Sequence, residues 1–359
     1  MLTRVPDYYD EFRCLAGDCP HICCEKWEVV LDADTVCRYQ DVPGSLGDRL
    51  RAAMREDGEG DVCFPLNGNR CPFLDGDNLC EIHRELGEAT TSVTCREHPR
   101  FTEDYGAFRE TTLSASCPAA NALLLGSGEP LTFRELETAE PEEDGDPLLA
   151  GLLPLRQRLL DILADRNLPL RRRLESFLLL AAEAQGYLDE EREAELPALA
   201  ADWAMPEETT WPEAEHSLLF PDGLRFLASL EALDGDWPAL LKQAESTPPA
   251  PVPEALLERV AVYFAFRYLL KAVNDGDLLG RAELCVFAVL AVERLAAVCG
   301  LSEALRRFSC EIEHNGDNLE ALLDEFRREE RLSCRAMLGA LSDETVACAC
   351  CHLQGMTSC

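Results

Sequence analysis

Lysine is almost absent from this chain of 359 residues and occurs only at Lys26, Lys242 and Lys271. Acidic residues number 67 against 33 basic ones, so the formal net charge is −34. A surface of this sign repels phosphate backbones and anionic lipids, and we expect neither nucleic acid nor a membrane as a partner. The negative electric field of this surface would attract a lysine-bearing protein. An acidic surface that is simply solvated, with no such partner, explains the charge equally well.

Long hydrophobic runs are also missing. The longest, Leu284 to Val292, is followed by Glu293 and Arg294 and is well short of the roughly 20 residues that a membrane-spanning helix needs. The first ten residues show neither the basic nor the apolar segment of a secretory signal. We therefore expect a cytoplasmic protein whose thiols stay reduced.

Cysteine, in contrast, is abundant: ten of the eighteen cysteines fall in the first 117 residues. Eight of these form one pattern, Cys14-x4-Cys19-x3-Cys23-Cys24, Cys71-x8-Cys80, Cys95 and Cys117. Disulfide-dense chains are typically small and secreted, so a cluster in a chain of this length indicates metal ligation. Thiolates favour zinc or an iron–sulfur cluster. Ordinary buried cysteines are the alternative, but they are common singly rather than in clusters.

The spacing limits which cysteines can bind the same metal ion, but it leaves more than one set of ligands possible. Adjacent Cys23 and Cys24 do not easily ligate one tetrahedral ion together, whereas Cys19 and Cys23 would share a helical face. Between Cys71 and Cys80, Asp-Gly-Asp-Asn predicts a turn that brings these two cysteines together. The eight thiolates would suit one four-cysteine site with spares, or two metal sites.

The rest of the chain predicts a mainly α fold with little β structure. We expect a cysteine-rich region at 1–125, an acidic connector at 126–147, a helical domain at 148–345 and a cysteine-rich tail at 346–359. One short strand is expected at 27–31, followed by a helix through Val42 with Asp34 or Thr35 as its N-cap. Apolar residues recur three and four apart, as in core-facing helices, at Leu152, Leu155, Leu159, Ile162 and Leu163, at Val260, Phe264 and Tyr268, and at Leu284, Phe287 and Leu290.

Polar residues stand out near the far end. Glu311 and His314 are three apart on a predicted helix, so they would share a face and could supply a base or a cofactor anchor. A structural interpretation competes with this one. Asn315-Gly316 reads as a helix stop, and Asp317 to Glu320 as a capping box that opens the next helix.

Several of these segments resemble one family. The stretch from Tyr9 to Trp27, together with the segments Cys71-Pro-Phe-Leu, Leu79-Cys80, Cys95-x3-Pro99-Arg100 and Ser116-Cys117-Pro118, is similar to the bacterial flagellin lysine-N-methylases. The segment Glu311-Ile-Glu-His314-Asn-Gly-Asp-Asn318 resembles the same family. One departure is Glu25-Lys26 before Trp27, where the family commonly has glycine second.

The resemblance implies a protein-lysine N-methyltransferase that acts on flagellin or a similar surface protein with S-adenosylmethionine as methyl donor. It also implies a [4Fe-4S] cluster on four or more of the eight cysteines, with zinc as the alternative metal. No Gly-x-Gly-x-x-Gly occurs, so a donor site would not be of the Rossmann type. The Cys-x3-Cys-x2-Cys triad of radical enzymes is not matched either, which favours polar methyl transfer.

Under this resemblance, Glu311 and His314 are the catalytic candidates, and Arg100, Trp27 and Asn318 are the cofactor-binding ones. Arg100 could pair with a cofactor carboxylate or with thiolates, and a capped turn at Pro99 is the alternative. Trp27 would shield the cluster or stack on adenine. Two other classes remain open, a metal-binding module for metal handling and a cysteine-based redox sensor. A helical body of this size favours the enzyme.

Overall fold

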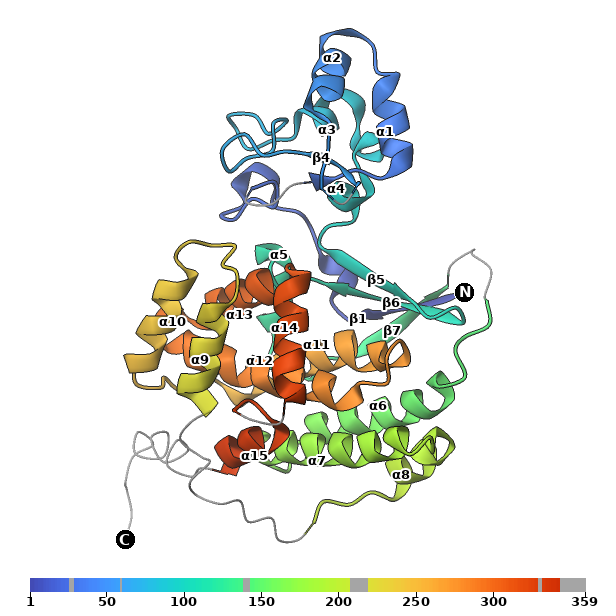
Figure 1. Ribbon diagram of the computed structural model, residues 1–359, viewed down its shortest axis with the longest axis vertical. Coiled ribbons are helices and arrows are strands. Elements are labelled where there is room, and N and C mark those ends of the chain that lie inside the picture. The colour runs from blue at the N-terminus through green and yellow to red at the C-terminus, as the bar shows by residue number, and fades with distance from the viewer. Residues whose placement is uncertain (26–28, 59, 138–142, 207–218, 329–330, 343–359) are drawn as a thin grey trace. The chain divides into compact units, whose positions relative to one another are not determined.

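The computed structural model describes residues 1–25, 29–58, 60–137, 143–206, 219–328 and 331–342 (Figure 1). The fold is mainly α, as the sequence predicts. The chain forms two compact units. The helical unit comprises Met1–Tyr8, Glu103–Thr111 and Ala122–Cys359, and the cysteine-rich unit comprises Tyr9–Thr102 and Thr112–Asn121.

The helices are α1 (Ala33–Gln40), α2 (Gly44–Ala53), α3 (Glu81–Leu86), α4 (Val93–Glu97), α5 (Pro118–Leu125), α6 (Leu149–Ala164), α7 (Leu170–Asp189), α8 (Leu196–Asp202), α9 (Leu219–Ser229), α10 (Trp237–Ser246), α11 (Glu254–Tyr268), α12 (Leu278–Cys299), α13 (Leu301–Phe308), α14 (Gly316–Arg327) and α15 (Cys334–Ser342). The strands are β1 (Leu2–Pro6), β2 (Val29–Val30), β3 (Arg55–Glu56), β4 (Val62–Phe64), β5 (Arg100–Asp104), β6 (Phe108–Leu113) and β7 (Phe133–Glu137).

Helix α12 is the core of the helical unit. Every residue from Arg281 to Val292 is buried, and the helix packs against α7, α10, α11, α13 and α14 (Figure 1). The apolar run seen in the sequence is therefore a helix surrounded by other helices. Across the described ranges, no helix combines the length and apolar character needed to cross a membrane.

The predicted apolar stripes lie in helices and face the core. Leu155, Leu159 and Leu163 on α6 are fully buried, as is Phe264 on α11. Helix α6 contacts α7, α8 and α11, and α11 contacts α12 (Figure 1). These contacts confirm the helices expected from the three- and four-residue spacing.

The strands are more extensive than the single one expected. A four-stranded sheet has the order β5-β6-β1-β7, with β1 parallel to β6 and antiparallel to β7. Strand β7 lies within the acidic stretch 126–147. Strand β1 is more than a hundred residues away in sequence from its two partners, β6 and β7. Local sequence patterns therefore give little sign of this pairing.

A small sheet, β2-β4-β3, anchors the cysteine-rich unit. Its core contains Val29, Leu31, Tyr39, Leu50, Phe64, Phe73 and Ile82, against which Cys71 and Cys80 pack. Strand β2 lies within the expected strand 27–31, of which residues 27 and 28 are outside the described residues.

The expected N-cap of α1 was wrong. Asp32 caps the helix, because its carboxylate accepts hydrogen bonds from the Thr35 N–H at 2.9 Å and the Thr35 hydroxyl at 2.8 Å. The helix ends at Gln40 rather than at Val42. Asp32 also accepts the Val93 N–H at 2.9 Å, a contact from 61 residues further along the chain. Because this contact helps to hold the Asp32 side chain in place, Asp32 rather than Asp34 is the capping residue.

Candidate functional site

All eight cysteines of the pattern lie in the cysteine-rich unit, and none of them forms a disulfide. Three of them, Cys14, Cys23 and Cys95, are exposed, and the other five are half-buried. The Cys14 sulfur accepts the Ala16 N–H at 3.3 Å, and the Cys19 thiol donates to the His21 carbonyl at 3.1 Å. The predicted metal ligands are therefore accessible or nearly so.

The turn predicted between Cys71 and Cys80 is present. Asp75 closes it by accepting the backbone N–H groups of Asp77 at 3.0 Å and Leu79 at 2.9 Å. A β-bridge joins Leu74 to Cys80. The charge of Cys80 contributes, after burial, to raising the pKa of Cys71, as expected for two neighbouring thiols.

Cys24 and Cys95 lie near this turn. The Cys71 N–H donates to the Cys24 carbonyl at 2.9 Å, which ties the first and second cysteine segments together. Although part of Cys95 is exposed, the surrounding protein partly desolvates its sulfur, which raises the pKa of Cys95 to about 11; the charges of Cys71, Cys80 and Cys23 raise it further, against a hydrogen bond from Ser92 that lowers it. Sequence segments far apart thus bring their sulfurs within electrostatic reach of one another.

The adjacent cysteines differ in chemistry. A hydrogen bond from the Cys24 thiol to the Cys23 sulfur lowers the pKa of Cys23 to about 7, against burial. The same hydrogen bond, together with burial, raises the pKa of Cys24. Cys117, which precedes α5, is also close enough to Cys19 and Cys23 for their charges to raise its pKa, although burial is the larger cause. Cys23 is therefore the readier of the two adjacent thiols to ionise.

The thiols are not arranged as a preformed metal site. Within the part of the chain that the structure describes, no group of three or more His, Cys, Asp or Glu side chains is arranged to hold a metal ion. The donor chemistry suits a soft metal. A metal at this place would have to draw the sulfurs of several segments together, and the ionised thiols repel each other until it does.

Arg100 lies beside aromatic rings in the cysteine-rich unit. Its Nε donates to the Tyr9 hydroxyl at 3.1 Å, and its guanidinium carbon lies 5.8 Å and 5.4 Å from the ring centroids of Tyr9 and Phe12. Burial lowers the pKa of the nearby His98 to about 4, so this imidazole is neutral at pH 7. Trp27, the other predicted cofactor contact in this region, lies outside the described residues, as does the cysteine-rich tail from residue 346 onward.

At the far end, the structure places Glu311 and Asn318 against the loop before α10. Glu311 is buried, and its two oxygens accept the backbone N–H groups of Leu233 and Asp234, both at 2.8 Å. The Asn318 amide donates to the carbonyls of Glu231 and Glu311, again at 2.8 Å. Glu311 and Asn318 therefore hold the loop before α10 in place.

The corner that carries His314 also differs in detail from the sequence expectation. Residues Ser309–Glu313 form a π-helical turn, η7, rather than a regular α-helix, and His314 follows it, half-buried. Helix α14 begins at Gly316 with Asn315 as its cap, so the capping box expected from Asp317 was wrong. The Asn315 side chain accepts the Asn318 N–H at 3.1 Å, which satisfies an otherwise open helix-start donor.

Sequence reasoning missed a buried polar cluster in the same segment. The hydroxyls of Tyr263 and Tyr268 each donate to Glu313 at 3.1 Å, and Arg267 Nε lies 2.9 Å from the same carboxylate. The side chain of Glu313 has no exposed surface. Burial raises the pKa of Tyr268, and the charge of Glu313 raises it further. The spacing of Tyr263 and Arg267, one helical turn apart, is the available signal, but the apolar spacing of Val260, Phe264 and Tyr268 predicts Tyr268 as a core residue instead.

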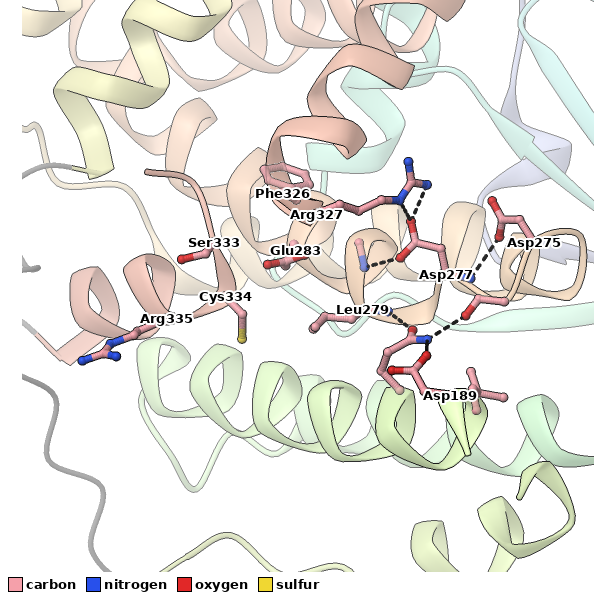
Figure 2. Close-up of a pocket in the computed structure, with 14 residues that line it drawn as sticks. Asp189, Asp275, Asp277, Leu279, Glu283, Phe326, Arg327, Ser333, Cys334 and Arg335 are labelled. Atoms are coloured by element: carbon pink, nitrogen blue, oxygen red, sulfur yellow. Dashed lines mark hydrogen bonds and ion pairs between the residues drawn. The ribbon is translucent and has the colours of Figure 1, made fainter. Parts of the chain in front are cut away.

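The helical unit also contains a hollow of about 710 Å³ between α7, the start of α12 and the α14–α15 region (Figure 2). Its lining includes the carboxylates of Asp189, Asp275, Asp277 and Glu283. Arg327 and Arg335 contribute guanidinium groups. We call this space the acidic hollow; no sequence motif indicated it.

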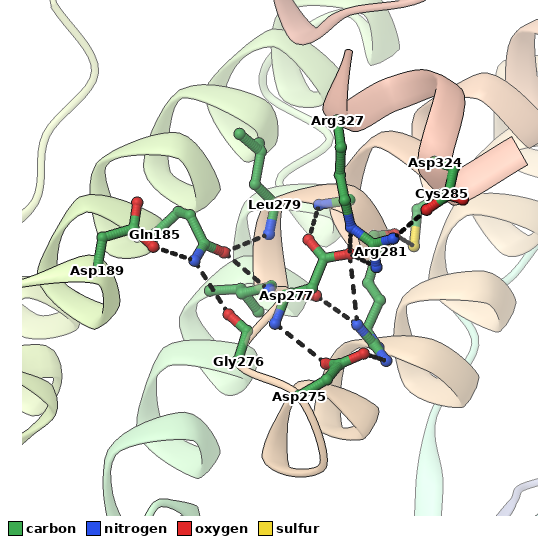
Figure 3. Close-up of polar contacts among 12 residues, drawn as sticks. Gln185, Asp189, Asp275, Gly276, Asp277, Leu279, Arg281, Cys285, Asp324 and Arg327 are labelled. Atoms are coloured by element: carbon green, nitrogen blue, oxygen red, sulfur yellow. Dashed lines mark hydrogen bonds and ion pairs between the residues drawn. The ribbon is translucent and has the colours of Figure 1, made fainter. Parts of the chain in front are cut away.

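Gln185 connects α7 to the start of α12 at the edge of the acidic hollow (Figure 3). Its carbonyl oxygen accepts the backbone N–H groups of Leu278 at 2.9 Å and Leu279 at 3.0 Å. Its amide donates to Asp189 Oδ1 at 2.8 Å and to the Gly276 carbonyl at 3.0 Å. One side chain therefore fixes both the loop and the first turn of the helix.

Asp277 caps the same helix and binds arginine (Figure 3). It accepts the Gly280 N–H at 2.9 Å and Arg327 Nη2 at 2.7 Å. A Cβ at Gly280 would lie 2.5 Å from this carboxylate, so a larger residue there would displace the capping side chain. Arg281 donates to the Asp277 carbonyl and to Asp275 at 2.8 Å. The loop before α12 is rigidly held.

The class of protein that this fold and site define is a helical protein with a cluster of free thiols. Comparison with known sequences is more specific. Lysine-N-methylases of Salmonella typhimurium and Salmonella choleraesuis are each 26% identical over 163 residues, which are 44% of this chain and 40% of each relative. The flagellar biosynthetic protein FliU of Salmonella muenchen is 26% identical over 136 residues, 36% of this chain and 80% of that protein.

The chain thus spans 40% of the length of the curated lysine-N-methylases that it matches. No protein-family model matches it, and no solved structure does. The relatives confirm, at low identity and over less than half of this chain, the resemblance to the flagellin lysine-N-methylase family.

Proposed function

We propose that this protein transfers methyl groups from S-adenosylmethionine to lysine side chains of a protein, flagellin or a similar surface protein. The observation that carries the proposal is the similarity to relatives named as lysine-N-methylases and as a flagellar biosynthetic protein. The formal net charge of −34 supports it, because an acidic surface attracts a lysine-bearing substrate.

The proposal includes a [4Fe-4S] cluster held by four or more of the eight cysteines, with zinc as the alternative metal. The proximity of the Cys24, Cys71 and Cys80 backbones supports this, as do the charges of Cys71 and Cys80, which are close enough to raise the pKa of Cys95. When bound, the metal would supply a cross-link between three segments of a small unit. Polar methyl transfer needs no electron, so the cluster has a structural role in this proposal.

Methyl transfer requires a neutral lysine amine, whose pKa in water is ~10.4. The protein must lower that pKa by burial or remove the proton with a base. We propose His314 as this base, because Glu311 already uses both carboxylate oxygens on backbone N–H groups. In this proposal Asn318 acts on the cofactor by holding the loop at Glu231, and Arg100, which lies beside Tyr9 and Phe12, acts as a cation toward it.

The test is methyl transfer in vitro. Purified protein is incubated with flagellin and S-adenosylmethionine that carries a labelled methyl group, and peptides are mapped by mass spectrometry. The matched control is flagellin whose lysines have been chemically blocked. Label on lysine of untreated flagellin alone is the expected result, and no label on any lysine-bearing protein would overturn the proposed activity.

The metal is tested separately on protein purified without oxygen. Iron and sulfide in about equal amounts with broad visible absorption would support the cluster. Zinc alone would select the alternative metal. Protein that holds neither metal yet methylates lysine would remove the cluster from the proposal and leave the activity in place.

A further inference from the structure

Strand β7 is the outermost strand of the four-stranded sheet (Figure 1). It pairs with β1 on one side, and within the described ranges no other helix or strand packs extensively against it. The outer strand of a sheet leaves every second backbone N–H and C=O group without a partner in that sheet. The edge of β7 is therefore a place where an extended segment can be added as a further strand.

The pairing at the start of β7 sets which of its peptide groups face β1. The Asp7 N–H donates to the Thr132 carbonyl at 2.9 Å, and the next pair along the register is Pro6 with Phe133. Antiparallel partners alternate between pairs that exchange hydrogen bonds and pairs that do not. Pro6 and Phe133 are thus a pair that exchanges none, which suits a proline because it has no N–H to donate.

The same alternation continues to the end of the strand. The backbones of Arg134 and Leu136 face β1, one and three positions beyond Phe133. The N–H and C=O groups of Glu135 and Glu137 therefore point away from β1, toward the open edge. These two residues offer a new strand its backbone hydrogen bonds.

Strand β7 also packs on the stretch of α11 that contacts the segment of the proposed base. The Phe133 ring stacks on Phe266 of α11, with the ring centroids 3.8 Å apart. The next residue of α11, Arg267, has its Nε 2.9 Å from the carboxylate of Glu313, which directly precedes His314. A segment added to β7 would therefore be held in the same part of the helical unit as the proposed base.

The side chains along the open edge are mainly acidic. Those of Glu135 and Glu137 lie on one face of the strand and are exposed, whereas Arg134 lies on the other face. Arg4 donates to Glu135 at 3.2 Å and compensates part of its charge, although half of the Glu135 side chain stays exposed. Residues 135–147 contain seven acidic residues and no basic one. The edge therefore keeps an excess of negative charge.

This charge selects among the segments that fit the edge. Pairing with β7 of a second copy would bring acidic strands together, and like charges on neighbouring strands destabilise a sheet. A segment with lysines two residues apart would instead place its ammonium groups on the face of Glu135 and Glu137, because side chains alternate along a strand. A cationic, extended segment is therefore favoured over a second copy.

We propose that the open edge of β7 binds an extended, lysine-bearing segment of the protein substrate as an added strand. The identity of this partner rests on the proposed function. The outward peptide groups of Glu135 and Glu137 hold the backbone of the segment, and their carboxylates favour lysine over acidic residues.

The test measures binding of a fluorescent peptide of alternating valine and lysine to the full chain by anisotropy. Two variants, Glu135→Ala and Glu135→Pro, both remove the carboxylate, but only the proline removes the outward N–H. Proline is tolerated at such an outer position because its nitrogen does not face the neighbouring strand. We expect Glu135→Pro to bind the peptide about tenfold more weakly than its matched control Glu135→Ala.

Equal affinities of Glu135→Pro and Glu135→Ala would overturn strand addition, as would a lack of binding by the unaltered protein. A second probe is the same peptide methylated at its backbone nitrogens, which removes its own N–H donors. It should bind the unaltered protein about tenfold more weakly, and equal binding of the two peptides would overturn the proposal. This comparison decides alone if Glu135→Pro does not fold, as judged by circular dichroism.

Methylation of flagellin separates this inference from the proposed function. Relative to Glu135→Ala, Glu135→Pro should raise KM about tenfold with kcat within a few-fold, because docking and not chemistry is lost. An unchanged KM would overturn the docking edge and leave the methylation standing. Peptide binding without any methylation by the unaltered protein would overturn the proposed function alone. A dimer in sedimentation that Glu135→Pro abolishes would assign the edge to a second copy and overturn the proposed partner.

Discussion

Replacing Glu311 by alanine is expected to loosen the loop before α10 while the catalytic chemistry persists. Both oxygens of this buried carboxylate accept backbone N–H groups, from Leu233 and from Asp234. Asn318 holds the same loop through the Glu231 carbonyl. Asn315 also donates to the Glu231 side chain at 3.4 Å, so the variant removes one of several side chains that hold the loop against the η7–α14 corner.

The magnitude follows from the two bonds. A hydrogen bond to a charged group contributes ~1.5–3 kcal/mol, so two bonds give a sum of ~3–6 kcal/mol. Leu233 and Asp234 are half-buried, so water can take up part of what the carboxylate releases. We expect a loss of ~2–4 kcal/mol in the free energy of unfolding. Glu320→Gln, at an exposed position on α14, is the control and should change stability by less than ~0.5 kcal/mol.

Two measurements check this reasoning. Urea unfolding should show a lower midpoint for Glu311→Ala, and hydrogen exchange should speed up at the amides of Leu233 and Asp234. Methyl transfer per folded molecule should stay within a few-fold of the unaltered protein. Unchanged stability together with lost methyl transfer would refute the anchoring role and restore Glu311 as a catalytic residue.

Four further predictions follow from the other sites. Cys19→Ala or Cys23→Ala should lower the bound iron and sulfide, and full retention in both variants would remove these ligands from the set. His314→Ala should reduce turnover with metal content intact, whereas normal methylation would make His314 structural. In metal-free protein the alkylation rate of Cys23 should rise with pH through about 7, because the Cys24 thiol stabilises its thiolate; Cys24→Ala should move this rise to higher pH, and an unmoved profile would contradict the hydrogen bond. Glu313→Ala should cost ~3–5 kcal/mol in urea unfolding because it leaves a buried arginine without its carboxylate, and a loss below ~1 kcal/mol would show that water enters the cluster.

Local patterns in the sequence were enough for much of the fold. The spacing of Leu155, Leu159 and Leu163 predicted α6, because an amphipathic helix turns the same face to the core every three or four residues. Asp75 and its neighbours predicted the turn between Cys71 and Cys80, because short polar residues satisfy the backbone locally.

The residue types of the thiol cluster, and the family resemblance that they carry, were likewise readable from the chain. What the sequence could not fix was any choice that depends on a distant partner. Asp32 caps α1 and also accepts Val93, and β1 pairs with two strands from much later in the chain.

The tertiary structure also decided the roles of the polar residues near the far end. Glu311 and Glu313 are two residues apart in one segment, yet one holds a loop and the other sits among two tyrosines and an arginine. The acidic hollow likewise brings Asp189 and Glu283 to one space from different helices. Periodicity encodes which face of a helix is buried, but the partner that each polar group meets there is set only when the helices pack.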